Sequence, residues 1–487
     1  MEKLKIAYKN ILSCSTTSLH FYQGTLALPK YFSGISTDTR SCREEDLFVA
    51  IAGESFDGFD HLEKVLENAS NRILLAVFQS SAKNTQRLLS FQAKYSHISF
   101  LEVTNSITFL QELAGHHRDD WMAHSAQNSI IGITGSNGKT TTKEMVAHFF
   151  EAIYPKKVLA TRGNLNNHIG VPLTLLRLTS QHQIAIIEMG SNHPGEIEAL
   201  CNIARPHSGI ITNIGSAHLE FFKDEEGVFL EKSALYRAIW GRPDRKFFII
   251  PLDDPYLSRL APFPGAFFFA EKEASSLSDT HSFWQLRFTA SNSLVLINRT
   301  QNITININND AVSEKHNLKN LAMALLLAYC YSPNALRELE LAGNNFSPPK
   351  NNRSMWVTPD NSSVQIFLDA YNANPSSMRA SLLYFCEHAN ANSIDLGECA
   401  FILGDMNELG DRCQEFHVEI GSLMAQQKIT AAFFIGKYAK FYQQGFGNTG
   451  KVFEQKSAFL PLWMEIRKKY RYVFIKGSRS VQLESLV

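Results

Sequence analysis

The feature that most constrains the fold is an alternation, from about residue 130 onward, of short apolar runs with amphipathic stretches of helical length. This pattern predicts βαβ units and therefore a mostly parallel sheet covered by helices, an α/β fold. Buried strands are expected at IIGIT, IAIIEMG, GIITNIG and KFFII, which start at Ile130, Ile184, Gly209 and Lys246. A strong helix is expected over residues 317–331.

Two interruptions divide the chain into three expected α/β domains. A polar insertion from about residue 273 to 310 alternates in the manner of β-hairpins. The run GNNFSPPKNN, from Gly343, breaks every periodicity and is interpreted as a linker. Strands are expected after it at VQIFLDAY, AFILGDM, AAFFIGK and YVFIKGS, with a helix over residues 376–388, and before the central region around GISTDTR and DLFVAIAG. The expected domains are 1–103, 104–345 and 346–487.

The composition is that of a globular protein whose charges balance. With 487 residues the chain is too long for one core, and about two to four domains are expected. Because 47 Lys and Arg balance 47 Asp and Glu, no net field would attract nucleic acid or anionic lipid. The start MEKLKIAYKN lacks a signal-peptide core, and LAMALLLAYCY is too short to span a bilayer. The seven cysteines form no C-x-x-C pair, so neither a zinc ribbon nor a disulfide framework is expected. We expect a cytoplasmic protein without nucleic-acid partners or membrane insertion.

The motif with the clearest chemical meaning is GSNGKT, residues 135–140, between the first of these strands and a helix. Such a loop aims backbone N–H groups at an anion, and the helix N-terminus adds partial positive charge. The strict P-loop pattern has a glycine where Ile133 stands, so the loop is a shortened relative. Lys139 can reach the outer phosphates, and the Thr140 hydroxyl can bind Mg²⁺. The predicted nucleotide contacts are Gly135, Ser136, Asn137, Gly138, Lys139, Thr140 and Thr141; an ordinary glycine-rich turn is the weaker alternative.

Ionisable residues follow the next strands. Glu188 ends IAIIEMG, where a buried strand would otherwise avoid charge, and His218 comes just after GIITNIG. Since open α/β sheets bind ligands at the carboxyl ends of their strands, we expect Thr140, Glu188 and His218 to lie near bound magnesium. A helix cap is the alternative for Glu188, and a structural role is the alternative for His218. Lys232 lies in an amphipathic helix and, by pattern alone, would be a solvated lysine paired with a glutamate.

A series of motifs resembles the Mur ligases. They are GITGSNGKTTTKEM, TRGNLNNHIGVPLTLL, IIEMGSNHPGEI, TNIGSAHLE, HNLKNLAMAL, NNRS, LDAYNANPSSMRA and ILGDMNELG, and the likeness runs in order from about Gly34 to the C-terminus. Within the family the chain is most similar to the members that add D-alanyl-D-alanine to UDP-N-acetylmuramoyl-tripeptide. The run DAYNANPSSM is the most specific, and the D-N-P-R motif of the diaminopimelate-adding members is absent from the sequence.

The resemblance implies a fold and an activity. The fold would be a central P-loop-type ATPase domain between an N-terminal UDP-peptide domain and a C-terminal Rossmann-like domain. The activity would be an ATP-dependent ligation through an acyl phosphate, which gives the UDP-muramoyl-pentapeptide precursor of peptidoglycan, ADP and phosphate. The implied cofactors are ATP, two Mg²⁺ ions and a carbamylated lysine, and the implied state is a monomer. Whether the third peptide residue is diaminopimelate or lysine stays open.

The resemblance also implies roles for individual residues. The catalytic residues would be Lys139, His218 and Lys232, the last carbamylated by CO₂. The metal ligands would be Thr140, Glu188, His218 and Lys232. The nucleotide would also contact Asn320, Arg353 and Asp369. The substrate contacts would be Thr37, Asp38, Arg40, Gly53 and Asp57 for the UDP-sugar peptide, Asn164 and Asn167 on the acceptor side, and Tyr371, Asn372 and Asn374 in the YNANP run. For the first five, turn and capping roles are the alternative.

Two other functions are compatible with a phosphate-binding loop. One is another amide ligase of the same superfamily, either similar to folylpolyglutamate synthetase or a different Mur ligase. The YNANP run and the N-terminal domain argue against it. The other is a P-loop GTPase or ATPase switch that makes no bond. A GTPase would carry an N-K-x-D motif, and the sequence has none.

Overall fold

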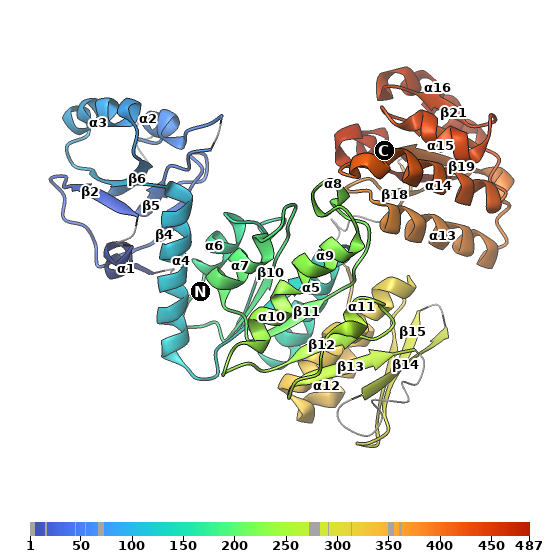
Figure 1. Ribbon diagram of the computed structural model, residues 1–487, viewed down its shortest axis with the longest axis horizontal. Helices are drawn as coiled ribbons and strands as arrows, with labels where there is room; N and C mark the ends of the chain where they lie inside the picture. Colours follow the sequence, from blue (N-terminus) through green and yellow to red (C-terminus); the bar gives the residue numbers. More distant parts are fainter. Residues whose placement is uncertain are drawn as a thin grey trace.

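The computed structural model describes residues 5–14, 17–43, 45–53, 55–66, 73–271, 283–290, 292–312, 314–348, 355–359 and 363–487. These residues form three α/β units, and the expected α/β fold class is confirmed. Figure 1 shows the N-terminal unit in blue and the C-terminal unit in red at opposite ends of the long axis, with the central unit between them. Within the described residues, every helix is too short or too polar to cross a bilayer.

The N-terminal unit is built on a five-stranded sheet in the order β2-β7-β6-β5-β4. Strands β4 to β7 pair in parallel, and β2 pairs with β7 in antiparallel fashion. The strands are β1 (Ile6–Ala7), β2 (Ser18–Tyr22), β3 (Tyr31–Phe32), β4 (Gly34–Ser36), β5 (Asp46–Val49), β6 (Leu75–Gln79) and β7 (Ser99–Val103), and the helices are α1 (Tyr8–Ser13), α2 (Leu62–Leu66) and α3 (Ala82–Lys94). The strands expected at GISTDTR and DLFVAIAG are β4 and β5.

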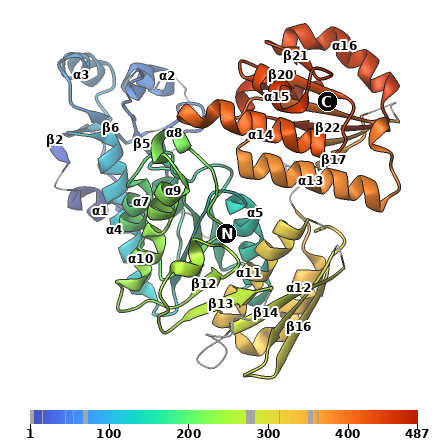
Figure 2. The same ribbon diagram turned by 45° about the vertical axis from the view of Figure 1, so that its right-hand side comes forward.

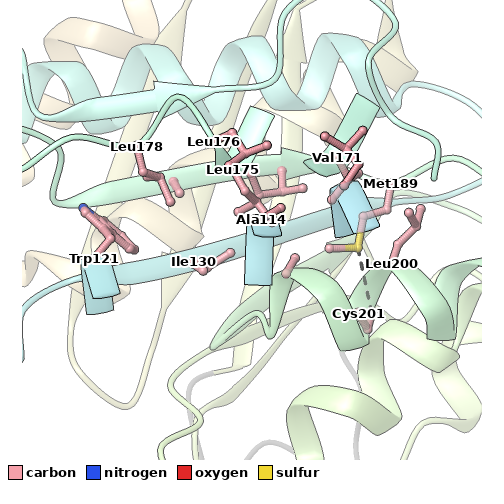
Figure 3. Packing of buried hydrophobic residues seen from close by; sticks show 14 of the residues in the cluster. Ala114, Trp121, Ile130, Val171, Leu175, Leu176, Leu178, Met189, Leu200 and Cys201 are labelled. Carbon is pink, nitrogen blue, oxygen red and sulfur yellow. Dashed lines mark hydrogen bonds between the residues drawn. The ribbon is translucent and has the colours of Figure 1, made fainter. Parts of the chain in front are cut away.

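The long helix α4 (Ser106–His124) connects the N-terminal unit to the central unit. It packs against α1 on one side and against α6 and α7 of the central unit on the other. Figure 3 shows this core, in which Ala114 and Trp121 of α4 lie among buried leucines of the segment that contains α6. The two units therefore share one hydrophobic core.

The central unit holds a nine-stranded sheet in the order β16-β15-β14-β13-β12-β11-β8-β10-β9. In this sheet order, neighbours pair in parallel between β9 and β14 and in antiparallel fashion between β14 and β16. The expected hairpin insertion is therefore confirmed where it is described. The strands are β8 (Ser129–Thr134), β9 (Val158–Ala160), β10 (Ile184–Glu188), β11 (Ser208–Ile211), β12 (Phe248–Pro251), β13 (Ala266–Ala270), β14 (Phe283–Ala290), β15 (Ser293–Asn298) and β16 (Ile303–Asn308). The helices are α5 (Lys139–Ile153), α6 (Gly170–Leu175), α7 (Glu196–Ala204), α8 (Leu219–Phe222), α9 (Glu225–Lys232), α10 (Ala234–Trp240), α11 (Lys315–Tyr331) and α12 (Leu336–Asn345).

The start of the expected linker is helical instead. Residues 343–345 form the last turn of α12, which packs on β16 and α5. The reason is steric: a Cβ on Gly343 would lie 2.5 Å from Ile307 Cδ1, so this glycine permits the close approach of helix to strand. The packing of α12 at Gly343 outweighs the low helix propensity of glycine. The end of the expected linker, residues 349–352, lies outside the described residues.

The C-terminal unit has a six-stranded sheet in the order β17-β18-β22-β19-β20-β21. All neighbours pair in parallel except β17, which is antiparallel to β18. The strands are β17 (Met355–Val357), β18 (Gln365–Asp369), β19 (Cys399–Gly404), β20 (Ala432–Ile435), β21 (Lys451–Phe453) and β22 (Tyr472–Lys476), and the helices are α13 (Pro375–Ala391), α14 (Cys413–Gln426), α15 (Ala439–Phe446) and α16 (Lys456–Lys469). Figure 2 shows α13 on the side that faces the central unit.

Candidate active site

The loop of residues 135–140 joins β8 to α5, as the motif predicts. Two of its glycines have positive φ, 142° at Gly135 and 77° at Gly138. A Cβ on Gly135 would lie 2.0 Å from Thr212 Oγ1, and one on Gly138 would lie 2.7 Å from Asn320 Nδ2. Both positions therefore need glycine for conformation and for space.

Side chains beyond β11 hold this loop in shape. The Asn137 N–H donates to Asn213 Oδ1 at 3.1 Å, and Thr212 Oγ1 donates to the Asn137 carbonyl at 2.6 Å. Ser136 Oγ donates to the Gly215 carbonyl and accepts from the Gly215 N–H. The sequence analysis predicted Ser136 and Asn137 but not their partners Thr212, Asn213 and Gly215. They occupy the end of GIITNIG, where the strand stops at Ile211 because the polar side chains that follow bind the loop.

Lys139 extends back across the loop that precedes it. Its Nζ donates to the Gly135 carbonyl at 2.8 Å and to the Ser136 carbonyl at 3.1 Å. Lys139 is also the first residue of α5, a helix of 15 residues. The ammonium group and the positive end of the helix dipole therefore point to one place, an arrangement suited to a phosphate chain.

Glu188 and Thr140 lie side by side, as expected from their positions after neighbouring strands. Thr140 Oγ1 donates to Glu188 Oε1 at 3.1 Å, and Asn166 Nδ2 donates to the same oxygen at 2.8 Å. Glu188 is only 1% exposed, and its second oxygen, Oε2, is buried without a hydrogen-bond partner in the part of the chain that is described. A buried carboxylate oxygen without a partner is costly unless a cation binds it. This observation fits a magnesium ligand.

Glu188 does not cap a helix, so that alternative is wrong. The N–H groups of Gly195 and Ile197, at the start of α7, donate instead to the carboxylate of Glu231 at 2.7 Å. No cluster of three or more His, Cys, Asp or Glu suited to a metal exists among the described residues. A magnesium ion here would therefore take much of its coordination from phosphate oxygens and water, as Mg²⁺ commonly does.

The stretch RGNLNNHIG contributes an asparagine that the sequence analysis passed over. Asn166 contacts Glu188, whereas the side chain of Asn167 accepts from the N–H groups of Ile169 and Gly170 in a local turn. Asn164 supplies its carbonyl to the Asn166 N–H at 2.8 Å. The motif marked the right segment, but only the fold shows which amide group points toward the end of β10.

His218 links the central and C-terminal units. It has a left-handed backbone, with φ of 54°, and precedes α8. Its Nδ1 hydrogen-bonds Glu408 Oε2 of the C-terminal unit, and this contact lowers the pKa of Glu408. The Glu220 N–H donates to the Glu408 carbonyl at 3.0 Å. This leaves Nε2 as the ring nitrogen with which His218 could bind a metal.

Lys232 is buried, with 1% exposure, so its interpretation by pattern as a solvated lysine is wrong. Its Nζ donates to Ser191 Oγ at 2.6 Å and to the Ser191 carbonyl at 3.4 Å. Burial, followed by repulsion from Lys139, lowers the pKa of Lys232 to about 7. A helical pattern could not reveal this, because the burial depends on Phe222 and Ser191, which lie outside α9 and against the lysine.

The loop opens onto a cleft between the central and C-terminal units. Its volume is about 430 Å³, within the range of small-molecule sites. The predicted nucleotide contacts Asn320 and Asp369 line it, as do Tyr371 and Asn372. Asn374 does not line the cleft but closes one end of it, because its Nδ2 donates to Asn137 Oδ1 at 2.8 Å while its Oδ1 caps α13. Arg353 lies outside the described residues.

Lys476 is a cleft residue that the sequence analysis missed. It is 1% exposed and forms an ion pair with Asp369, whose Oδ2 also accepts from Ser381 Oγ at 2.6 Å. The available signal was the one that identified Glu188, a charge at the end of a buried strand, here YVFIK. His316, Asn317 and Ser376, which also line the cleft, had no comparable signal.

The substrate contacts expected in the N-terminal unit lie apart from this cleft. Asp38 binds the Arg40 backbone and guanidinium, which lowers the pKa of Asp38 to about 2. Thr37 precedes this turn. The Gly53 N–H donates to the Phe56 carbonyl, and Asp57 caps the next turn while accepting from Asn84. Turn and capping contacts are therefore what these residues make within the described chain.

Comparison with known proteins identifies related chains over nearly the whole length. Residues 133–328 match the Mur ligase middle domain, and residues 352–479 match the Mur ligase glutamate ligase domain. A Bacillus subtilis (strain 168) protein named UDP-N-acetylmuramoyl-tripeptide–D-alanyl-D-alanine ligase is 31% identical over 482 residues, which cover 96% of this chain and 95% of the relative. An Escherichia coli (strain K12) protein of the same name is 28% identical over 463 residues, 93% of this chain and 92% of its own.

Solved structures agree with these sequence relatives. A crystal structure of MurF from Acinetobacter baumannii superposes with a TM-score of 0.78 at 25% identity, covering 100% of this chain and 98% of that one. MurF ligase from Thermotoga maritima, solved in complex with ADP, shares the fold with a TM-score of 0.69 at 24% identity, covering 93% of this chain and 95% of that one.

Proposed function

We propose, because this chain belongs to the Mur ligase family, that it is an ATP-dependent ligase that adds D-alanyl-D-alanine to UDP-N-acetylmuramoyl-tripeptide. The product is the UDP-muramoyl-pentapeptide precursor of peptidoglycan, and ADP and phosphate are released. The observation that carries this function is the cleft in which the phosphate loop meets the YNANP run, joined by the Asn137–Asn374 hydrogen bond.

The three units divide the work, with proposed domains at 1–103, 104–345 and 346–487. The first binds the UDP-sugar peptide, with Thr37, Asp38, Arg40, Gly53 and Asp57 as its contacts. The second binds ATP. The third closes over ATP and delivers the dipeptide. Its Arg353 reaches the nucleotide, and its substrate contacts are Tyr371, Asn372 and Asn374. The acceptor side of the second unit is lined by Asn164 and Asn167. A monomer is proposed from the family resemblance, and the ATP and UDP-linked substrates support a cytoplasmic enzyme.

The chemistry requires that a carboxylate approach a polyanion. The terminal carboxylate of the tripeptide attacks the γ-phosphorus of ATP, which gives an acyl phosphate and ADP. The dipeptide amine then attacks the acyl carbon, and phosphate leaves. Lys139 and the N-terminus of α5 supply positive charge at the phosphates, and closure of the cleft excludes water.

Magnesium fits the residues on this side of the cleft. Thr140 Oγ1, Glu188 Oε2 and His218 Nε2 would hold it, together with a carbamylated Lys232 for a second ion. When bound, Mg²⁺ supplies charge that neutralises the phosphate oxygens. His218 keeps its orientation through Glu408, so it acts as an orienting group or ligand rather than as a general base.

The surroundings of Lys232 support its carbamylation. CO₂ reacts only with a neutral amine, and an ordinary lysine with a pKa near 10.5 is almost wholly protonated at neutral pH. The pKa of Lys232 is about 7, so above pH 7 most of this amine is neutral. The carbamate replaces this neutral amine with an anion, and a bound metal ion would compensate the cost of burying that charge.

With ¹³C-labelled bicarbonate, we expect a carbamate resonance that appears as pH rises through about 7 and is absent from K232M. Removing CO₂ should lower activity reversibly. Exposed Lys157, at the opposite edge of the sheet, provides the matched control K157M, which should keep the resonance. An enzyme that is fully active without CO₂ and shows no resonance would contradict the modification.

The function itself is tested by phosphate release. Purified protein with MgATP should release phosphate only when UDP-N-acetylmuramoyl-tripeptide and D-Ala-D-Ala are both present, and the pentapeptide should form in equal amount. Use of a single amino acid such as diaminopimelate in place of the dipeptide would assign the chain to another Mur ligase activity. Phosphate release without either substrate would indicate an ATPase instead.

A further inference from the structure

The proposed acceptor, D-Ala-D-Ala, carries a charge at each end. Its amine must reach the acyl phosphate near Lys139 and Thr140, so its carboxylate lies at the far end of the dipeptide, about 7 Å away when extended. A carboxylate that enters a closing cleft needs a cation or several N–H donors, because losing its hydration is costly. If the proposed function holds, one group of this chain must meet this carboxylate.

Most charged groups at the carboxyl edge of the C-terminal sheet already have partners. Lys476 is paired with Asp369. The carboxylate of Asp405 accepts from the N–H groups of Lys437 and Tyr438 at 2.8 and 2.9 Å. Glu408 is paired with His218. Lys456, after β21, donates to the Gln482 carbonyl and to Ser485 Oγ. Among the described residues that directly follow these strands, Arg479, after β22, and Lys437, after β20, have no side-chain hydrogen bond or ion pair.

Arg479 is the one of these two that adjoins the cleft. Its Cζ lies 5.2 Å from the centroid of the Tyr371 ring, and Tyr371 lines the cleft. Within residues 363–487 and the rest of the described chain, no carboxylate forms an ion pair with Arg479. Its guanidinium therefore keeps its N–H donors for a ligand while an aromatic face positions it.

The two residues that flank Arg479, Ser478 and Ser480, are both held by hydrogen bonds. The Asn407 N–H donates to Ser478 Oγ at 3.2 Å, and Asn407 Nδ2 donates to Ser480 Oγ at 2.8 Å. The Ser478 N–H donates to the Asp405 carbonyl at 2.9 Å. Arg479 thus projects from a fixed turn, and fixed positions make better binding groups than free surface side chains.

Lys437 is too far from the cleft to do the same. Lys437 follows β20, whereas Tyr371 follows β18. In the sheet order β18-β22-β19-β20 these two strands are three places apart. At about 4.8 Å per strand this is roughly 14 Å. Lys437 is exposed, as Arg479 is, and its Nζ also lies over a tyrosine, Tyr438. It is therefore a matched control.

We propose that Arg479, positioned by Tyr371, binds the C-terminal carboxylate of the dipeptide acceptor. It is a substrate-binding residue that selects acceptors with a free C-terminal carboxylate. A fork of two N–H groups on a carboxylate gives strong and oriented binding.

The test compares R479Q and wild-type enzyme with D-Ala-D-Ala and with its C-terminal amide, which lacks the charge. We expect R479Q to raise the KM for D-Ala-D-Ala about tenfold or more, the loss expected for a hydrogen bond to a charged group. The KM values for ATP and for the UDP-peptide should change less than about twofold on the same reasoning. Wild type should prefer the acid to the amide, R479Q should lose that preference, and R479K should retain part of it. K437Q should behave as wild type.

An unchanged preference in R479Q would overturn the inference, as would a rise in KM for ATP or the UDP-peptide in place of the dipeptide. Matching circular dichroism spectra and melting temperatures establish that the variants are folded. Wild-type enzyme that does not use D-Ala-D-Ala would reject the proposed function itself, and this outcome is distinct from an active wild type whose selectivity R479Q leaves intact.

Discussion

K139A is expected to lower kcat by about a thousandfold or more, because the variant loses the cation that neutralises charge on the transferred phosphoryl group. The fold should persist. The side chain contacts only the carbonyls of its own loop, Gly135 and Ser136, among the hydrogen bonds described for it, and it fills no part of the hydrophobic core. The measurement is steady-state phosphate release with circular dichroism melting, where a shift of less than about 2 °C is expected.

The control for this loss is K157A, which removes an exposed lysine from the opposite edge of the same sheet. It should leave kcat unchanged. If K139A retained near-wild-type turnover, the loop of residues 135–140 would not be the phosphate site and the nucleotide would have to bind elsewhere.

E188Q should separate activity from stability. The amide cannot provide the anionic oxygen that a magnesium ion needs, so kcat should fall about a hundredfold or more. Without magnesium, the free energy of unfolding should stay the same or rise by about 1–3 kcal/mol, since the variant removes a buried carboxylate oxygen without a partner. Titration of activity with Mg²⁺ and chemical denaturation with EDTA measure the two effects.

Glu102 supplies the matched control, because it is also buried but lies in the N-terminal unit, where it accepts from Tyr22 and Ser80. E102Q should leave the Mg²⁺ dependence of activity unchanged. An E188Q enzyme with wild-type Mg²⁺ dependence would show that this carboxylate does not hold the metal.

The strands of both large sheets could be predicted because they are buried on two faces and therefore appear as continuous apolar runs. The same reasoning predicted that Thr140 and Glu188 would lie together, since adjacent parallel strands end at one edge. It did not predict where GIITNIG stops being a strand. The Thr212 N–H still donates to the Thr134 carbonyl of β8, while its hydroxyl donates to the Asn137 carbonyl of the phosphate loop, a partner 75 positions away in the chain.

Contacts between units were beyond sequence reasoning. Asn137 and Asn374 are separated by 237 positions, and no periodicity relates residues in different domains. The burial of Lys232 has a different origin, because it arises from packing within the central unit against Phe222 and Ser191. Only the family resemblance singled it out. Lys476 was within reach of the rule applied to Glu188, because it is a charge at the end of a buried strand. Asn166 was not, because only the fold shows which asparagine of its segment contacts Glu188.

The central claim is that this cleft joins a carboxylate to an amine through an acyl phosphate, with cleavage of the outer phosphate bond of ATP. It is tested most directly with UDP-N-acetylmuramoyl-tripeptide that carries ¹⁸O in its terminal carboxylate, incubated with MgATP and D-Ala-D-Ala. The attacking oxygen must leave with phosphate, so the label is expected in inorganic phosphate, one atom for each pentapeptide formed, alongside ADP. Label in AMP with release of pyrophosphate, or pentapeptide formed with no label in phosphate, would contradict the account.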